Sequence, residues 1–251
     1  MGAYVIIQSA NNNFSEIQVI GFDADDTLWE NEDIFLNTQK EFKEIFKNYS
    51  SNFDEELLKI EKENLDKYGY GVKGFILSLI ETSIYVSENK IDSESIEKIL
   101  RLGKEMLSSP VTLIDGVKET LEILSKEYQL ILITKGDLLD QERKIKNSKL
   151  FEYFDYIEII SEKNEESYLD ILQKKNINPR NFLMVGNSLK SDISPVINIG
   201  GKAIYIPYKL TWANEVVKNA DLPTGYLHLE KISFIHSYLN KLTRSEGSDI
   251  S

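Results

Sequence analysis

The sequence contains no cysteine and only two histidines among its 251 residues. Without cysteine the chain forms no disulfide and offers no thiolate ligand to a metal ion. Lys and Arg total 29 against 41 Asp and Glu, so the formal net charge is −12. Because affinity for a phosphate backbone comes from Lys and Arg, such a surface repels DNA and RNA. A nucleic-acid partner is therefore not expected, although a local site for a small phosphoester is compatible with this charge.

Long apolar runs are also lacking. No stretch of the sequence approaches the ~18 apolar residues of a membrane-spanning helix. The N-terminus has no basic segment followed by an apolar core, so no secretory signal is expected either. The sequence predicts a cytoplasmic protein with no membrane partner, and it gives no indication of the oligomeric state.

The most informative segment of the chain is residues 17–29. An apolar run of strand length, with Val, Ile and Phe, ends on three carboxylates: Asp23, Asp25 and Asp26. The run is typical of a buried strand at the centre of a parallel sheet. Two interpretations of the acids are open, a solvated acidic turn and a metal site in which one carboxylate also does chemistry. Trp29 is close enough to the turn to flank such a site, although a packing role is the simpler expectation.

Residues 31–107 have a different character, because apolar residues recur there at helical spacing. Four such stripes predict an inserted, all-helical segment. Between the second and third helices lies a glycine-rich loop, Tyr68 to Phe75, which includes Lys73. Three glycines allow this loop to approach a ligand closely, and a plain interhelical turn is the alternative.

Strands and helices alternate from Pro110 onward. Strands are predicted at 129–133, 156–160, 182–185 and 203–206, and helices at 116–128, 138–147, 165–175 and 232–242. This alternation predicts an α/β fold, a Rossmann-like parallel sheet covered by helices on both faces. Its core comprises residues 17–30 and 108–242, after an N-terminal extension, 1–16, in which residues 4–7 are able to add a strand. Residues 243–251 are predicted to be a flexible tail.

Polar residues follow several of these predicted strands at their carboxyl ends, where ligands bind in such sheets. They are Asp23, Asp25, Thr134, Lys163, Asn187 and Asp192. Phosphoryl transfer requires neutralisation of the non-bridging oxygens, an in-line nucleophile and a proton donor for the leaving oxygen.

Each of these requirements has a candidate in the sequence. Asp23 and Asp192 are able to hold Mg²⁺, which prefers oxygen ligands. Thr134 and the backbone N–H of Lys135 or Gly136 are suited to phosphate oxygens, and Lys163 supplies a fixed positive charge. One aspartate is able to attack phosphorus, and a second to exchange a proton with the leaving group.

These motifs, taken in order, resemble those of the haloacid dehalogenase-like hydrolases over roughly residues 17–242. The four signatures are Asp23-Ala24-Asp25-Asp26-Thr27, then Thr134, then Lys163, then Gly186-Asn187 with Asp192. The resemblance implies that Asp23 is the nucleophile and becomes an aspartyl-phosphate. It implies that Asp25 is the general acid and base.

The resemblance also implies a reaction class and a cofactor. The acid at position 25 favours a phosphatase over a dehalogenase, with Mg²⁺ bound by Asp23, the carbonyl of Asp25, Asn187 and Asp192. The insert is similar to the small helical cap that closes over small phosphorylated metabolites, with Lys73 in the region that touches substrate.

Three positions depart from the family pattern. Asn187 stands where an acid is common, Lys135 where Asn is common, and Asn164 where Pro is common. Asn187 is able to ligate through its amide oxygen, with Asp192 either moving in or holding metal-bound waters, and which of the two binds the metal directly stays open. Lys135 is able to add attraction for an anionic substrate. A phosphomutase, a catalytically silent binding protein and a receiver-like signalling domain are the alternatives. Receivers are about half this length, lack a helical insert and carry their phosphoacceptor on a later strand. The two histidines, His228 and His236, receive no role.

Overall fold

The computed structural model describes residues 5–7, 14–46, 52–213, 215–216 and 223–246. The described strands form one seven-stranded sheet in the order β1-β7-β6-β5-β2-β3-β4. All neighbouring strands run parallel except β1 and β7, which are antiparallel. The strands are β1 (Val5–Ile7), β2 (Val19–Phe22), β3 (Gln129–Lys135), β4 (Tyr156–Ile160), β5 (Phe182–Gly186), β6 (Lys202–Tyr205) and β7 (Tyr226–His228).

Strand β2 lies at the centre of the sheet and is buried on both faces. Its residues alternate between two apolar clusters, since Val19 packs with one cluster and Ile20 and Phe22 with the other. Both faces of a parallel sheet are covered by crossover helices, which explains why the strand reads as a continuous apolar run. Asp23 and Asp25, which follow β2, therefore lie at the middle of the sheet edge.

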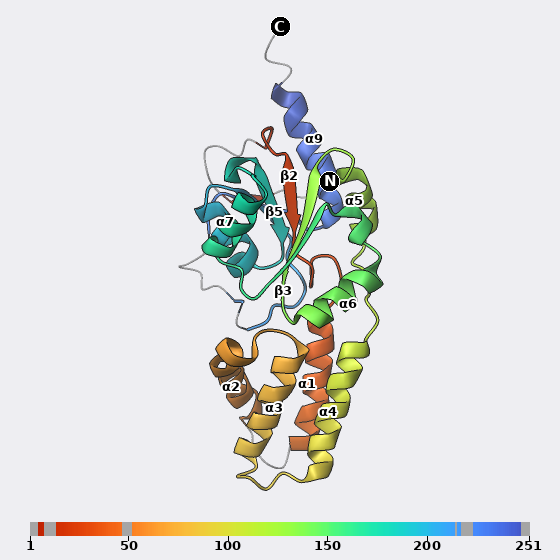
Figure 1. Ribbon diagram of the computed structural model, residues 1–251, viewed down its shortest axis with the longest axis vertical. Helices are drawn as coiled ribbons and strands as arrows, with labels where there is room; N and C mark the ends of the chain where they lie inside the picture. The colour runs from red at the N-terminus through yellow and green to blue at the C-terminus, as the bar shows by residue number, and fades with distance from the viewer. Residues whose placement is uncertain (1–4, 8–13, 47–51, 214, 217–222, 247–251) are drawn as a thin grey trace.

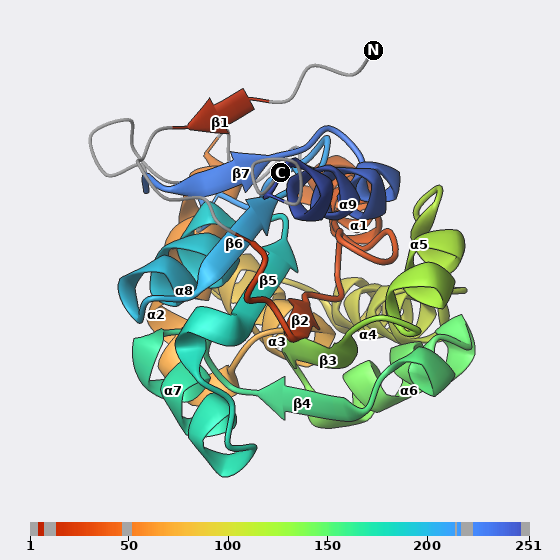
Figure 2. The same cartoon turned by 90° about the horizontal axis from the view of Figure 1, so that it is seen from above.

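Helices cover the two faces of the sheet, as Figure 2 shows in a view from above. One face carries α5 (Val117–Leu124), α6 (Leu138–Ser148) and α9 (Ile235–Glu246), and the other carries α7 (Glu165–Lys174) and α8 (Ser194–Asn198). Short 3₁₀ turns lie at Phe151–Tyr153, Pro179–Asn181 and Ile232–Phe234. A π-helical turn, η3 (Leu189–Ile193), follows β5.

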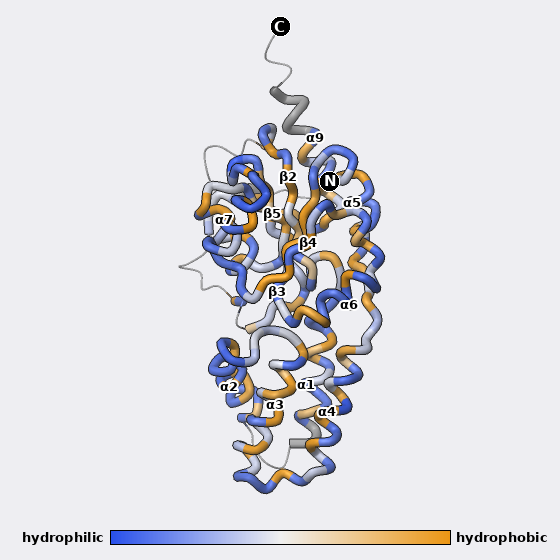
Figure 3. The backbone as a smooth tube through the Cα atoms, in the orientation of Figure 1, coloured by the Kyte–Doolittle hydropathy of each residue, from blue (hydrophilic) through white to orange (hydrophobic). Residues whose placement is uncertain are grey.

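The cap is a bundle of four helices at one end of the elongated molecule (Figure 1). Its helices are α1 (Glu32–Phe46), α2 (Phe53–Tyr68), α3 (Val72–Val86) and α4 (Ser93–Ser108). The bundle has its own apolar core, separate from the clusters of the sheet and including Phe42, Leu79 and Ile99. Apolar segments occur in the cap helices as well as along the strands in Figure 3. The carboxyl end of β2 points toward this cap, so the catalytic candidates lie between two independently packed units.

The predicted fold class is confirmed, but several element boundaries differ. Thr134 and Lys135 are the last residues of β3 and do not follow it. Helix α3 begins at Val72, so Lys73 belongs to a helix and not to a loop. Helix α9 continues to Glu246, past the predicted start of the tail at residue 243. Residues 1–4 and 8–13 of the predicted N-terminal extension lie outside the described residues.

Strand β7 was not among the predicted strands, since three residues are too short for a periodicity signal. The predicted added strand near the N-terminus is present as β1. None of the described helices combines the length and the apolar character required to cross a membrane.

Candidate active site

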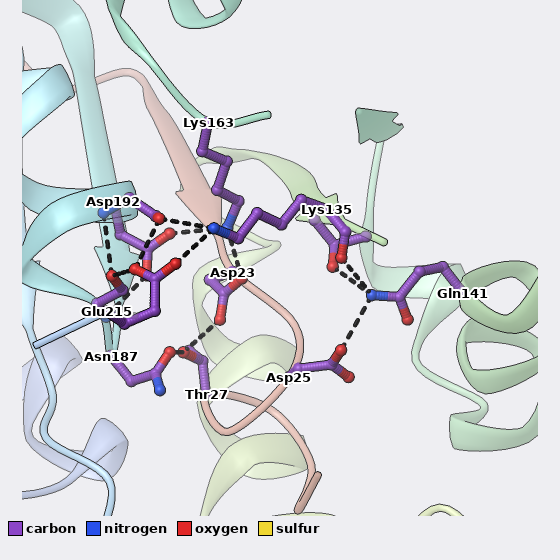
Figure 4. A network of polar contacts seen from close by, with 12 residues as sticks. Asp23, Asp25, Thr27, Lys135, Gln141, Lys163, Asn187, Asp192 and Glu215 are labelled. Atoms are coloured by element: carbon purple, nitrogen blue, oxygen red, sulfur yellow. Dashed lines mark hydrogen bonds and ion pairs between the residues drawn. The ribbon is translucent and has the colours of Figure 1, made fainter. Parts of the chain in front are cut away.

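The carboxyl ends of β2, β3 and β5 and the segment after β4 bring the predicted site residues together (Figure 4). Asp23 and Asp25 come directly after β2, and Asp192 lies in η3 after β5. Lys163 precedes α7, whose N-cap is the next residue, Asn164. The Asn164 side chain accepts from the backbone N–H of Ser167, and the Ser167 hydroxyl accepts from that of Asn164. Asn in place of Pro therefore begins the helix with a side-chain cap and fixes the position of Lys163.

Lys163 bridges two carboxylates at the centre of the site. Its Nζ lies 2.5 Å from Asp23 Oδ1 and 2.7 Å from Asp192 Oδ1, and all three residues are buried. Burial raises the pKa of Asp23 to about 7, Lys163 opposes this shift, and the neighbouring Asp192 adds to it. The two carboxylates raise the pKa of Lys163, which stays charged. One ammonium thus stabilises two acids that would otherwise repel each other out of water.

Asp192 is positioned by its surroundings in β5 and η3. Its Oδ2 accepts from the backbone N–H of Ser188 at 2.9 Å. A Cβ on Gly186 would come within 2.3 Å of the same oxygen, so only glycine leaves room for this carboxylate. The π-helical turn, a type of bulge found often at functional sites, places Asp192 back against the end of the strand.

Thr27 connects Asp23 to Asn187. Its hydroxyl lies 2.9 Å from Asp23 Oδ2 and 3.3 Å from Asn187 Oδ1, so a carboxylate oxygen and an amide oxygen converge on one point. No group of three or more Asp, Glu, His or Cys side chains suited to a metal occurs among the described residues. The donor set is nevertheless made of oxygens, which is the set that Mg²⁺ prefers when it keeps several waters. The residues therefore fit such an ion through one carboxylate, one amide and further oxygens.

Asp25 is held by three side chains that the sequence reasoning either missed or left without a role. Lys144 Nζ lies 2.7 and 2.8 Å from its two oxygens, Trp29 Nε1 donates to Oδ1 at 2.7 Å, and Gln141 Nε2 donates to Oδ2 at 3.0 Å. Gln141 and Lys144 lie three residues apart in α6 and are both buried. The indication in the sequence for these two residues is that polar side chains lie on the face of α6 that packs against the core.

Thr134 is the last-but-one residue of β3 and also faces this network. Its hydroxyl lies 2.8 Å from Gln141 Nε2, which also donates to the backbone carbonyl of Lys135 at 2.9 Å. Gly136 follows with a φ of 144°, a conformation that side-chain-bearing residues rarely adopt. Thr134 and Gly136 both line the cavity described below, and their role in binding phosphate stays a prediction.

Lys135 does not present a free positive charge, in contrast to the expectation. Its Nζ lies 2.5 Å from Glu215 Oε1 and 2.9 Å from Ser191 Oγ, and it sits over the ring of Tyr70 at 4.2 Å. The other oxygen of Glu215 accepts from Ser188 and Ser191. Glu215 lies in an irregular segment without periodicity, so no sequence pattern pointed to it. Through its contact with the ring of Tyr70, Lys135 thus links the core to the loop between α2 and α3 of the cap.

Asp26, the third acid of the cluster, has a structural role. It has a φ of 61°, and its carboxylate accepts from the backbone N–H groups of Asn31 and Glu32 at 2.8 and 3.1 Å. These donors lie at the start of α1, where unpaired N–H groups need such acceptors. Burial raises the pKa of Asp26 to about 8. The acidic turn therefore both supplies the site and begins the cap.

A cavity of about 170 Å³ extends from these residues into the cap. Its core side includes Asp23, Thr134 and Lys163, and its cap side includes Phe35 and Phe75. Lys73 is not among the lining residues, because its Nζ pairs with Asp137 at 3.0 Å across the junction of cap and core. The structure brings together every predicted site residue except Lys73.

Comparison with known proteins supplies the family. The family model for haloacid dehalogenase-like hydrolases matches residues 17–200. The N-acylneuraminate-9-phosphatase of Mus musculus is 28% identical over 205 residues, which cover 75% of this chain and 82% of that protein. A crystal structure of a haloacid dehalogenase-like family hydrolase from Xanthomonas campestris has a TM-score of 0.82 and 36% identity, and covers 98% of this chain and 100% of that one.

A more distant structure shows the same fold. It is a putative hydrolase of this superfamily from Bacillus subtilis, bound to magnesium, with a TM-score of 0.64 and 15% identity over 89% of this chain and 99% of that one. The protein belongs to the haloacid dehalogenase-like hydrolases. It is a hydrolase, and its curated relatives include phosphatases.

Proposed function

We propose that this hydrolase is a Mg²⁺-dependent phosphatase that cleaves a small phosphorylated metabolite through an aspartyl-phosphate intermediate. The observation that carries the proposal is the pairing of Asp23 with Lys163 and Asp192, beside a second, separately held carboxylate on Asp25. A nucleophile and a proton donor need different environments. The surroundings of the two carboxylates differ, because Asp23 shares the buried ammonium of Lys163 with Asp192 while Asp25 is paired with Lys144 at the side of the cavity.

The two carboxylates would act in sequence. A carboxylate oxygen of Asp23 attacks phosphorus, and the bond from phosphorus to the leaving oxygen breaks while Asp25 donates a proton to that oxygen. Asp25, now ionised, accepts a proton from the water that attacks phosphorus, and Asp23 is released together with inorganic phosphate. Lys163 stays charged throughout and stabilises the phosphate oxygens.

A divalent cation bound beside Asp23 would neutralise negative charge on the non-bridging phosphate oxygens. Asp23, Asn187, the carbonyl of Asp25 and, directly or through water, Asp192 are the residues proposed to hold it. The charge of the cavity supports a requirement for such a cation, because each of the lysines in its described lining is paired with a carboxylate. Without an added cation, a phosphate dianion would meet predominantly negative surroundings.

The proposed substrate is a phosphomonoester small enough to fit beneath the cap. The mouse relative is an N-acylneuraminate-9-phosphatase, and a glyceraldehyde 3-phosphate phosphatase from Pyrococcus furiosus is 28% identical over 144 residues, 54% of this chain and 57% of that protein. Both names describe phosphate esters of small polyhydroxylated compounds. A phosphomutase would use the same site, and transfer of phosphate to a second hydroxyl of the substrate would distinguish it.

The test is phosphate release from p-nitrophenyl phosphate with Mg²⁺ and with EDTA, for the wild type and for Asp23→Asn. We expect turnover that requires Mg²⁺ and that Asp23→Asn abolishes, together with phosphorylated Asp23 in a rapidly quenched wild-type reaction analysed by mass spectrometry. Glu63→Gln is the matched control, since Glu63 is an exposed carboxylate of the cap outside the cavity. Turnover that survives Asp23→Asn would refute the nucleophile, and absence of turnover on a broad panel of phosphoesters would refute the proposed activity.

A further inference from the structure

The cavity is electrically asymmetric from its core end to its cap end. Its described lining contains three lysines, Lys135, Lys144 and Lys163, and all three come from the core. The cap wall is made by α1, α2, α3 and the loop between α2 and α3, and its described lining residues include no Lys or Arg. This wall has two carboxylates instead, Glu32 at the start of α1 and Glu61 in α2.

The side-chain carboxylates of Glu32 and Glu61 have no hydrogen-bond or ion-pair partner within the described part of the chain. Burial raises the pKa of Glu61 to about 7, and repulsion from Glu32 adds to the shift. Burial and the charge of Asp25 raise the pKa of Glu32 to about 7. Two half-buried acids near each other without a cation repel one another in the empty protein. They are expected to be stabilised by a ligand that brings a positive charge or strong donors.

A second, independent observation also points to a donor on the ligand. Gln141 lines the cavity and is 1% exposed, and its Oε1 has no hydrogen-bond partner in the described structure. The orientation of this amide is fixed, because its Nε2 faces the backbone carbonyl of Lys135 and the carboxylate of Asp25. A buried acceptor without a partner costs free energy, and a hydroxyl or an ammonium group on the ligand would satisfy it.

We infer that the cavity selects phosphomonoesters whose leaving group has an ammonium group, such as phosphorylated amino alcohols or amino sugars, and disfavours those with a carboxylate. The inference rests on the proposed phosphatase function and names its substrate class. The phosphate occupies the lysine-rich core end, and the ammonium group reaches Glu32 and Glu61 at the cap end. A carboxylate in that place would add a third negative charge to two that are already unpaired.

The class differs from what the curated relatives alone would suggest, because N-acylneuraminate is a carboxylate. Two aromatic residues of the cap, Phe35 and Phe75, also line the cavity, and their rings pack edge to face. An ion pair formed in a partly buried site is screened little by solvent. The difference in affinity between an ammonium compound and a carboxylate compound should therefore be large, although the two differ in one charged group.

The experiment measures competition against p-nitrophenyl phosphate, which reports binding whether or not a competitor is itself hydrolysed. Two size classes are compared: phosphoethanolamine with phosphoglycolate, and glucosamine 6-phosphate with glucose 6-phosphate and 6-phosphogluconate. We expect the ammonium compound to bind at least tenfold more tightly than the carboxylate in the size class that fits, with the neutral sugar between them. Equal binding or the reverse order in both classes would overturn the inference.

Variants connect the preference to the two acids. Glu61→Gln and Glu32→Gln keep the side-chain shape and should each reduce the ammonium-to-carboxylate ratio at least fivefold, while Glu63→Gln, the exposed control on the same helix as Glu61, should leave it unchanged. An unchanged ratio in both cavity variants would overturn the assignment. Failure of the proposed function is a separate outcome, because the wild type would then not hydrolyse p-nitrophenyl phosphate at all.

Discussion

Replacing Lys163 with methionine tests whether the buried triad is an ion cluster. The substitution keeps most of the aliphatic stem but removes the ammonium that lies 2.5 Å from Asp23 and 2.7 Å from Asp192. The side chains of Lys163 and Asp192 are each 1% exposed. Loss of one partner from a buried cluster leaves carboxylates that neither water nor protein neutralises. Such changes typically cost about 3–5 kcal/mol, and we expect a loss in that range at about pH 8.

The loss should depend on pH with a defined sign. The ordinary pKa of Asp is about 3.9, and without Lys163, which lowers the pKa of Asp23, the folded-state pKa of Asp23 rises further above that value. The folded variant therefore binds more protons than the unfolded chain, so its stability increases as the pH falls. In the wild type the pKa of Asp23 is already about 7, but the charged ammonium of Lys163 lies beside both carboxylates and offsets their repulsion. The deficit of the variant relative to the wild type should shrink between about pH 8 and pH 5.

Urea unfolding of both proteins in EDTA, followed by tryptophan fluorescence at these two pH values, measures the difference. Adding Asp192→Asn to Lys163→Met removes one of the orphaned charges and should recover about 1–2 kcal/mol at the higher pH. A deficit below about 1 kcal/mol, or one of equal size at both pH values, would refute the description of the triad as a buried ion cluster.

Three further substitutions test the surroundings of the triad. Lys144→Met leaves Asp25 without its closest cation and should lower kcat on p-nitrophenyl phosphate at least tenfold; a kcat within twofold of the wild type would contradict a positioning role. Gly186→Ala forces a Cβ to within 2.3 Å of Asp192 and should cost about 1–3 kcal/mol in urea unfolding, whereas a neutral effect would mean that β5 shifts freely. Asn164→Ala removes the N-cap of α7 and should cost about 1 kcal/mol, read as a lower Tm, and an unchanged Tm would show that the cap contributes nothing.

The convergence of Asp23, Lys163 and Asp192 was predictable because topology determines it. Parallel strands joined by crossover helices place all their carboxyl ends at one edge, so polar residues after successive strands meet however far apart they are in the chain. The cap was predictable for a different reason. Its helices have long apolar stripes that neither the strand pattern nor a loop would explain.

The residues that tune the site were not predictable in the same way. Lys144 and Gln141 belong to the middle of a helix, where a polar side chain is ordinarily exposed, and only the three-dimensional position of α6 turns them toward Asp25. Glu215 comes from an irregular segment whose path no local pattern specifies. The charge on Lys135 was predicted to be free because its partner, Glu215, is distant in sequence. Ion pairs between residues that are far apart in the chain determine the charge of the site. Such pairs cannot be recognised in the sequence alone.

The distribution of charge across the cavity relates two features of the protein: Asn187, which stands where an acid is common in the family, and the acidic cap end. The described lining contains nine carboxylates, which are Asp23, Asp25, Asp26, Asp137, Asp140, Asp192, Glu32, Glu61 and Glu215, against three lysines. An acid at position 187 would have added a tenth carboxylate, at the end of the cavity where the phosphate is proposed to bind. With Asn187 the amide oxygen can still face a cation, while the phosphate meets one fewer repulsive group. The same surplus of negative charge at the cap end acts on the rest of the substrate, and it favours a leaving group of opposite charge.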